Sequence, residues 1–195
     1  PLFQGGAIIH LIDSIGELKG LDYYVPYHEQ SLAISVDAYS RIKGMGVGCV
    51  TSGPGGTNLI TGVCCSYYDS IPCLFITGQV GQFHIKRSKE MRQRGFQETD
   101  IVSLFSSITK YTYQIKDPNE VDYIFDKAVY LAKNGRPGPV LIDLPYNIQI
   151  ANINLKKMKK FLPPLPPKKY PRLLLQIKKV IKLLNENKKV VFVAG

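Results

Sequence analysis

One acidic residue and one glycine-rich turn are the first places in this sequence where chemistry could occur. Glu29 follows an aromatic and β-branched stretch, residues 22–27, and opens an amphipathic stretch, residues 29–43. A carboxylate at the end of a strand can accept a proton or hold a polar ligand. Helix dipoles also favour acids in a first helical turn, so a structural role is the commoner explanation of this position alone.

A Gly-Pro-Gly-Gly turn, residues 53–56, lies between an apolar run, residues 46–51, and a helical pattern, residues 57–68. Turns of this kind bring backbone N–H groups close to a ligand, often an anion. The segment is neither a Walker loop nor a Gly-x-Gly-x-x-Gly motif. Taken alone, it indicates either a ligand-binding turn or tight packing.

A basic segment lies between residues 86 and 94 and holds a single acid, Glu90. Its basic residues are Lys86, Arg87, Lys89, Arg92 and Arg94. A solvated loop is the simpler explanation. The alternative is a site for an anion, such as the carboxylate of a 2-keto acid, a sugar nucleotide or a flavin diphosphate.

Metal and thiol chemistry have little support in the sequence. The four cysteines form no Cys-x-x-Cys pair and no histidine lies at metal-ligand spacing, so no metal site is predicted. The cysteines are Cys49, Cys64, Cys65 and Cys73. We expect reduced thiols in a cytoplasmic protein. Any of the histidines could donate a proton, but lone histidines are more often structural. They are His10, His28 and His84.

The elements that must position these residues alternate between helix-like and strand-like stretches. Helical spacing marks residues 6–18, 29–43, 57–68 and 118–133. Apolar or β-branched runs predict strands at 22–27, 46–51, 72–77 and 139–144. This alternation predicts an α/β fold, a doubly wound parallel sheet with helices on both faces. Ligands of such sheets bind at the carboxyl ends of the strands, where Glu29 and the Gly-Pro-Gly-Gly turn would both lie.

The pattern changes near residue 150, and we expect three parts. These are a domain over 1–150, a Lys/Pro-rich linker over 151–171, and the start of a second, Rossmann-like domain over 172–195. The last part would contain a helix, Arg172 to Asn187, and a strand, Val190 to Ala194. Because the chain lacks an initial Met and stops directly after an apolar run, we expect a piece of a longer protein.

The formal net charge of +10 is concentrated near the end of the chain. Residues 156–195 carry 12 Lys or Arg and one acid. Nearly all of these bases are lysines with few aromatic residues among them, so we expect a solvated face and no nucleic-acid partner. No apolar run approaches the roughly 20 residues that span a membrane, so we expect no membrane partner.

Seven short segments occur in an order that is far more specific than any one of them. They are His28–Gln30, Thr51–Asn58, Asp69–Pro72, Thr77–Gln79, Phe96–Glu98, Ile108–Lys110 and Gly135–Val140. Together they closely resemble the amino-terminal domain of the acetolactate synthases and their thiamine-diphosphate-dependent relatives, over about residues 3–150. The resemblance implies a thiamine-diphosphate-binding fold and a carboligase that acts on pyruvate or a related 2-keto acid.

The resemblance also implies roles for single residues. Glu29 matches the glutamate that hydrogen-bonds the aminopyrimidine ring, a role that favours a carboxylate in a dry pocket. Gln97 matches a glutamine that reaches the reacting substrate, so both are expected to be catalytic. The remaining cofactor-binding positions are Thr51, Gly53, Pro54, Gly55 and Asn58. The substrate positions are Gly5, Gly6, Ala7, Phe96 and Lys110.

Other parts of the site are implied to lie outside this chain. Mg²⁺ would be bound by a carboxyl-terminal domain, FAD is a further candidate cofactor, and the site would lie between subunits of a homodimer or homotetramer. Gln4 stands where the family usually has the proline of a Pro-Gly-Gly segment, which leaves the substrate open. The alternatives are a 2-keto acid decarboxylase, an oxalyl-CoA-type lyase, and a non-catalytic interaction domain of the same fold.

Overall fold

The computed structural model describes residues 1–88, 90–165, 172–187 and 189–193. The chain divides into two units, Pro1–Leu162 and Pro163–Gly195, and each is described by itself. Within the described ranges, no helix has both the length and the apolar character that crossing a membrane requires.

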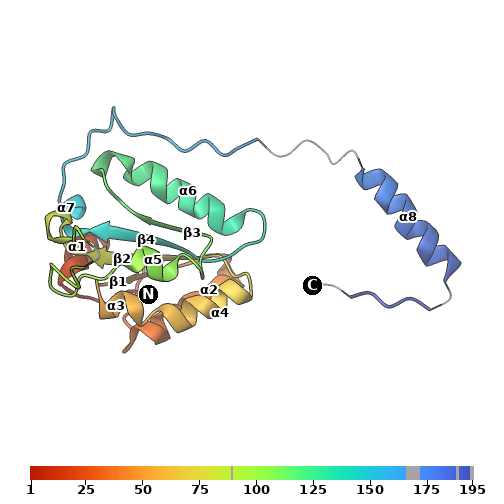
Figure 1. The fold of residues 1–195 in the computed structure, drawn as a ribbon, viewed down its shortest axis with the longest axis horizontal. Helices are drawn as coiled ribbons and strands as arrows, with labels where there is room; N and C mark the ends of the chain where they lie inside the picture. Colours follow the sequence, from red (N-terminus) through yellow and green to blue (C-terminus); the bar gives the residue numbers. More distant parts are fainter. Residues whose placement is uncertain (89, 166–171, 188, 194–195) are drawn as a thin grey trace. The chain divides into compact units, whose positions relative to one another are not determined.

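The first unit is built on a parallel four-stranded sheet (Figure 1). The strands are β1 (Gly46–Val50), β2 (Cys73–Gln79), β3 (Tyr111–Gln114) and β4 (Val140–Pro145). Their spatial order is β1-β2-β4-β3, and each neighbouring pair is parallel. Every residue of the two central strands, β2 and β4, is buried, which explains their largely apolar sequences.

Helices cover both faces of this sheet (Figure 1). They are α1 (Ile9–Glu17), α2 (Glu29–Lys43), α3 (Pro54–Thr57), α4 (Ile60–Tyr68), α5 (Ile101–Phe105), α6 (Val121–Lys133) and α7 (Tyr146–Gln149). Successive strand residues point to opposite faces. Phe75 and Leu141 pack with α2, α4 and α5, whereas Ile76 and Ile142 pack with α1, α6 and α7. The prediction of a doubly wound α/β fold is confirmed.

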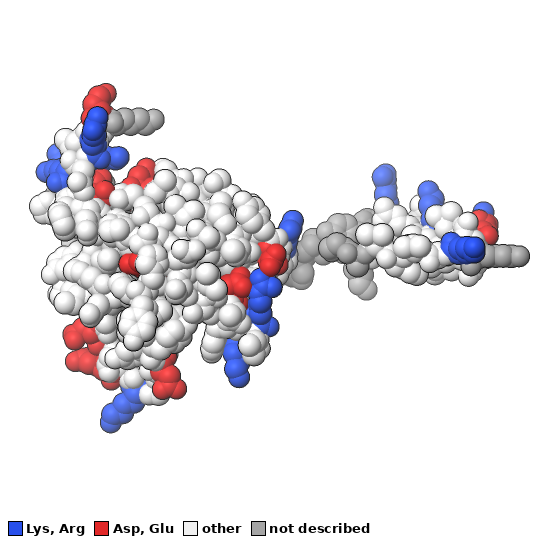
Figure 2. All heavy atoms as spheres, turned by 90° about the horizontal axis from the view of Figure 1, so that it is seen from below, with Lys and Arg blue, Asp and Glu red and all other residues white. Residues whose placement is uncertain are grey.

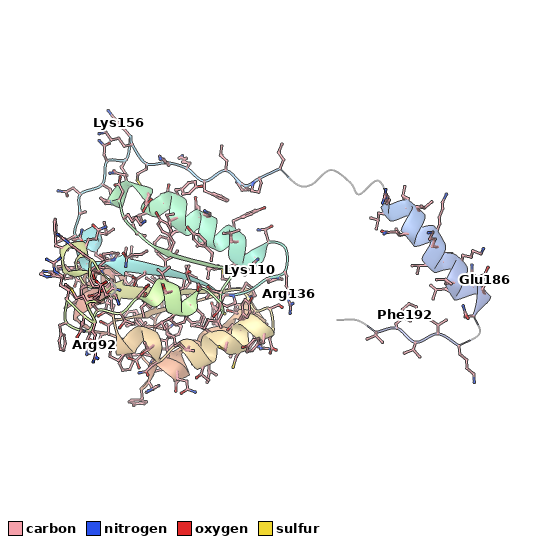
Figure 3. The ribbon with its side chains drawn as sticks, in the orientation of Figure 1. Arg92, Lys110, Arg136, Lys156, Glu186 and Phe192 are labelled. Atoms are coloured by element: carbon pink, nitrogen blue, oxygen red, sulfur yellow. The ribbon has the colours of Figure 1, made fainter. Side chains whose placement is uncertain are left out.

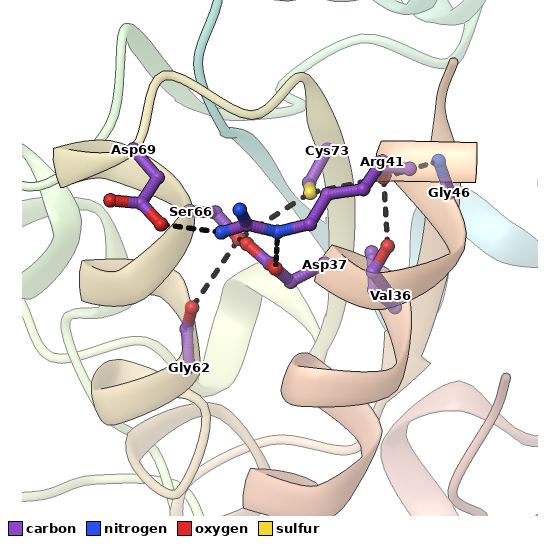
Figure 4. A network of polar contacts seen from close by, with 9 residues as sticks. Val36, Asp37, Arg41, Gly46, Gly62, Ser66, Asp69 and Cys73 are labelled. Atoms are coloured by element: carbon purple, nitrogen blue, oxygen red, sulfur yellow. Dashed lines mark hydrogen bonds and ion pairs between the residues drawn. The ribbon is translucent and has the colours of Figure 1, made fainter. Parts of the chain in front are cut away.

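A polar network joins α2 to α4 (Figure 4). Arg41 Nε lies 2.6 Å from Asp37 Oδ1, and Arg41 Nη2 lies 2.5 Å from Asp69 Oδ2. The Ser66 hydroxyl donates to Asp37 Oδ2 at 2.8 Å. At Gly62 the two helices are so close that an added Cβ would lie 2.4 Å from a side chain of α2. These contacts hold α2 against α4.

Residues 22–27 do not form the predicted strand. The amino-terminal residues occupy the outer edge of β1 instead. The N–H of Phe3 donates to the carbonyl of Cys49 at 2.8 Å, and the N–H of Cys49 donates to the carbonyl of Pro1 at 3.1 Å. Because that edge is already paired, the aromatic segment lies outside it as irregular chain, with the carbonyl of Tyr24 accepting an N–H of the amino-terminal segment at 3.0 Å.

The second unit contains α8 (Leu173–Glu186), within one residue of the predicted helix at each end. Its basic side chains project from the helix surface (Figure 2), in keeping with a solvated face. Residues 190–193 do not form the predicted strand, and residues 194–195 lie outside the described residues. A strand needs N–H and C=O partners on a neighbouring strand, and the described residues of this unit include no second strand.

Candidate functional site

The chain leaves β1 through a turn that only glycine can make. Gly53 has φ +57° and ψ −116°, a conformation that L side chains rarely adopt, and α3 begins at the next residue with Pro54. A Cβ on Gly55 would lie 2.8 Å from the Cγ2 of Thr51. The turn is therefore wound tightly against the end of β1, and helical structure begins at Pro54, inside the predicted turn and before the predicted helix start at residue 57.

Glu29 lies beside this turn, at the start of α2. Its neighbour His28 caps the helix, because His28 Nδ1 accepts the N–H of Gln30 at 3.1 Å. The Asn58 amide donates to Glu29 Oε2 at 3.0 Å, and the residue is only 8% exposed. Among the residues that the structure describes, no hydrogen bond reaches the other oxygen, Oε1. The carboxylate is thus shielded and fixed in direction, with one oxygen left to accept from a ligand.

Gln97 reaches the same turn from a distant part of the sequence. It has φ +57°, which is unusual for a residue other than glycine. A Cβ on Gly53 would lie 2.6 Å from the carbonyl oxygen of Gln97, so the two backbones are in direct contact. The neighbouring Phe96 ring is 84% exposed and points away from the core.

The loop that carries Gln97 is held by a buried acid. The N–H of Glu98 donates to the carbonyl of Gly95 at 3.1 Å, which closes a tight turn. The Glu98 carboxylate accepts the N–H of Lys86 at 3.0 Å and that of Arg94 at 2.9 Å. Glu98 therefore ties together both ends of the basic segment.

The predicted substrate residues near the amino terminus also join the site. A Cβ on Gly5 would lie 2.4 Å from the Cβ of Thr51, so this glycine allows close approach to the end of β1. The carbonyl of Ala7 accepts the side-chain amide of Gln149 at 2.7 Å. Gly6 lies between them, exposed and with open space around its Cα.

Lys110 is not brought together with these residues. It precedes β3 and lies at the amino-terminal end of the parallel sheet, whereas Arg92 lies at the opposite end (Figure 3). Its ammonium donates to the carbonyl of Leu131 and, at 2.6 Å, to that of Asn134 at the end of α6. Partial burial lowers the pKa of Lys110. In this structure Lys110 caps a helix.

The histidines and cysteines differ in their surroundings, and the buried Nε2 atom of His10 has no hydrogen-bond partner among the described residues. The His10 ring packs on Tyr146 with ring centroids 4.9 Å apart, and His84 is exposed. Burial raises the pKa of the Cys49 thiol to about 11 and also raises that of Cys73. Within the described residues, no group of three or more His, Cys, Asp or Glu side chains is placed to hold a metal ion.

The basic segment is largely on the surface. Arg87, Arg92 and Arg94 are exposed, Lys86 is half-buried, and Lys89 lies outside the described residues. A cavity of about 340 Å³ lies beside β3, with Lys86 and Lys116 in its wall. Glu29 is not among the residues that line it.

The sequence analysis missed one charged residue in the sheet, Asp143. It is completely buried in β4 and accepts hydrogen bonds from Thr77 Oγ1 at 2.7 Å, Gln79 Nε2 at 3.1 Å and Gln114 Nε2 at 2.7 Å. Burial raises the pKa of Asp143 to about 6, although these three donors act in the opposite direction. The available signal was a lone acid inside an apolar run, which requires internal partners.

Comparison with known proteins agrees with this geometry. Residues 2–104 match the family described as thiamine pyrophosphate enzyme, N-terminal TPP binding domain. The acetolactate synthase large subunit of Lactococcus lactis is 41% identical over 152 residues, which is 77% of this chain and 25% of that protein. The probable acetolactate synthase large subunit of Methanocaldococcus jannaschii is 40% identical over an alignment of 200 residues, covering 99% of this chain and 32% of that protein.

A third relative, the acetolactate synthase large subunit of Buchnera aphidicola from Acyrthosiphon pisum, is 39% identical over 161 residues. The chain spans between a quarter and a third of the length of these relatives. The family match covers more than half of the chain and includes β1, the Gly-Pro-Gly-Gly turn, Glu29 and Gln97. This chain therefore belongs to the thiamine pyrophosphate enzymes, as their N-terminal TPP binding domain.

Proposed function

We propose that this chain is the cofactor-activating domain of a thiamine-diphosphate-dependent carboligase that acts on pyruvate or a related 2-keto acid. The observation that carries the proposal is the contact of Glu29 with Asn58 beside the Gly-Pro-Gly-Gly turn. It leaves a shielded carboxyl group with one oxygen free, which would share a proton with a ring nitrogen of an aminopyrimidine. The named function of the relatives, acetolactate synthase, supports the choice of reaction.

The residues present fit the cofactor's pyrimidine half. A neutral pyrimidine nitrogen is an acceptor, so Glu29 Oε1 would carry the proton of the hydrogen bond to the ring, or accept it from the ring once the nitrogen is protonated, while Asn58 holds the other oxygen still. The low exposure of the carboxylate strengthens such a bond, because little water competes for it. Thr51, Pro54 and the glycines of the turn would line the ring. When bound, thiamine diphosphate supplies the nucleophilic carbon and the electron sink for loss of CO₂ from a 2-keto acid.

Gln97 is proposed to orient the substrate. Its backbone is in contact with Gly53, so its side chain starts from the edge of the cofactor site. Gly5, Gly6 and Ala7 would form the opposite wall, where small residues leave room for a ligand. Phe96 would cover the substrate only if a second surface approaches, since its ring is 84% exposed here.

The wider assembly is proposed on the same grounds. The Phe96 ring is 84% exposed next to Gln97, which supports a site completed by another subunit in a homodimer or homotetramer. Mg²⁺ would be held by a domain beyond this chain, and the exposed arginines of the basic segment are proposed to face an anion such as the FAD diphosphate. Residues 172–195 are proposed to begin the next domain. Four free cysteines support a reducing, cytoplasmic location.

The test is a substitution of Glu29 in the full-length protein that carries this chain. Glu29→Gln keeps the size and removes the carboxylate, so acetolactate formation from pyruvate should fall about 10²–10⁴-fold. Glu17→Gln is the matched control, because Glu17 is an exposed acid in the last turn of α1. It should keep wild-type activity.

Two results would contradict the proposal. One is a wild-type protein that consumes no 2-keto acid when supplied with thiamine diphosphate and Mg²⁺, which favours an interaction domain. The other is equal activity of the Glu29 and Glu17 variants. Accumulation of free aldehyde in place of a ligated product would instead identify a decarboxylase.

A further inference from the structure

The buried carboxylate of Asp143 needs an explanation beyond stability. Thr77 and Gln114 lie directly across from it in the neighbouring strands, and both donate to it. An apolar side chain at this position would avoid the desolvation of a charge and would leave a simpler sheet. The third donor, Gln79, connects the buried carboxylate to a loop outside the sheet.

Gln79 is the last residue of β2, and each end of its side-chain amide is engaged. Its Oε1 accepts the N–H of Val80 at 3.0 Å. Its Nε2 donates to Asp143 Oδ2 at 3.1 Å and to the carbonyl of Thr99 at 2.9 Å. An amide nitrogen has two hydrogens, so Asp143 takes one and thereby aims the other at Thr99.

Thr99 follows Gln97 by two residues. The other side of the same short loop is closed by the Gly95–Glu98 turn and by the Glu98 carboxylate. Gln97 itself has φ +57°, and such a conformation persists only where the surrounding structure fixes it from several sides. The Gln79 amide provides the contact that holds the loop from inside the sheet.

We propose that Asp143 is a positioning residue for Gln97, acting through the side-chain amide of Gln79 on the carbonyl of Thr99. The inference rests on the proposed function, because it assigns Gln97 to the substrate. It adds a residue in β4 that touches neither cofactor nor substrate to the groups on which turnover depends.

The first experiment measures turnover in the full-length protein. Asp143→Asn keeps the size but removes the negative charge that both glutamine amides share at Oδ2, and hydrogen bonds to a charged acceptor are about twice as strong as those to a neutral one, so the variant holds the Gln79 amide more weakly. We expect kcat to fall at least tenfold while half-saturation by thiamine diphosphate stays within twofold, because Glu29 is untouched. In a Gln97→Ala background, Asp143→Asn should cause no further loss, since residues that act as one unit are not additive.

The matched control is Asp37→Asn. Asp37 is also a buried carboxylate with side-chain donors, 8% exposed, but it lies between α2 and α4 and has no hydrogen bond to the Gln97 loop. Its variant should keep kcat within twofold. Gln79→Met is the second variant, since it cuts the connection without changing the acid, and it should reproduce the loss seen with Asp143→Asn.

The second experiment does not depend on activity. In the 195-residue chain, hydrogen exchange of the N–H groups of Lys86, Arg94 and Glu98 should be at least tenfold faster in Asp143→Asn and Gln79→Met than in wild type. The Asp37→Asn chain should show wild-type exchange there. Unchanged exchange at these three amides, or a kcat loss that adds fully to that of Gln97→Ala, would overturn the inference. A wild-type protein without activity would refute the proposed function alone, because the exchange result stands apart from it.

Discussion

Replacing Gly53 with alanine tests the close contact on which the site is built. The residue has φ +57° and ψ −116°, and an added Cβ would lie 2.6 Å from the carbonyl oxygen and 2.9 Å from the Cβ of Gln97. One of these Gln97 atoms is a backbone atom and the other is the Cβ, so neither can move away by a side-chain rotation. The Gln97 loop or the turn itself must move.

Two contributions set the magnitude. Holding an L residue in this region of φ and ψ costs about 1–3 kcal/mol. Crowding a packed contact costs about 1–3 kcal/mol more. The sum, about 2–6 kcal/mol, is a large share of the roughly 5–15 kcal/mol that stabilises a typical domain.

Gly44→Ala is the control for the backbone contribution. Gly44 ends α2 with φ 90° and ψ −24°, and nothing lies within 4 Å of an added Cβ. Its replacement should cost about 1–2 kcal/mol, from conformation alone. Urea unfolding of the 195-residue chain, followed by circular dichroism, measures both variants. If the free energies of unfolding of the two variants agree within about 0.5 kcal/mol, the contact of Gly53 with Gln97 contributes nothing and the reasoning is refuted.

Three further predictions concern stability. Burial raises the pKa of Asp143 to about 6 from an ordinary 3.8, so folding takes up a proton between these pH values. The contribution of Asp143 to the free energy of unfolding is therefore fully present below pH 4 and is lost as pH rises through 6. This loss amounts to about 3 kcal/mol. The difference in unfolding free energy between wild type and Asp143→Asn should change with pH by that amount, and a difference that stays constant with pH would contradict the prediction. Lys110→Met should lower the free energy of unfolding by about 1–2 kcal/mol, because it removes the hydrogen bonds to two carbonyl groups at the end of α6. The exposed Lys133→Met should lower it by only a few tenths of a kcal/mol, and equal losses in the two variants would exclude a capping role for Lys110. Phe161→Ala should cost about 1–2 kcal/mol in the same urea assay, since its ring packs 5.4 Å and 5.7 Å from two tyrosine rings of α6, and an unchanged midpoint would mean that this contact is not maintained.

The strongly periodic elements were predictable from the sequence. The central strands are apolar runs that are buried on both faces, and the start of the helix after Asp117 follows from a capping box with Glu120. β3 was not predicted because it is an edge strand of only four residues, although its alternation of aromatic and polar side chains is typical of a half-buried strand. The strand expected at 22–27 failed for the reverse reason, since its composition fits a strand but the edge it needed is taken.

The residues of the candidate site were predicted from the resemblance and not from local sequence patterns. Glu29 and Gln97 lie 68 positions apart in the sequence, and no local pattern indicates that both reach one turn. The contact depends on two backbone conformations with positive φ, which propensity does not reveal. For Lys110 the resemblance and the structure differ. The resemblance places this lysine near the substrate, whereas the tertiary structure places its ammonium group at the carboxyl-terminal end of α6.

The pairing of residues 1–3 with β1 has a consequence for handling the protein. That short stretch pairs with the outer edge of β1 at Cys49, and two residues later the chain reaches Gly5–Ala7, the proposed wall of the site. Trimming it would leave the N–H and C=O groups of Cys49 unpaired at an exposed edge of the sheet, where a second molecule could pair with them. It would also release the glycine wall from its anchor, so self-association and loss of ligand binding would arise together from one small deletion.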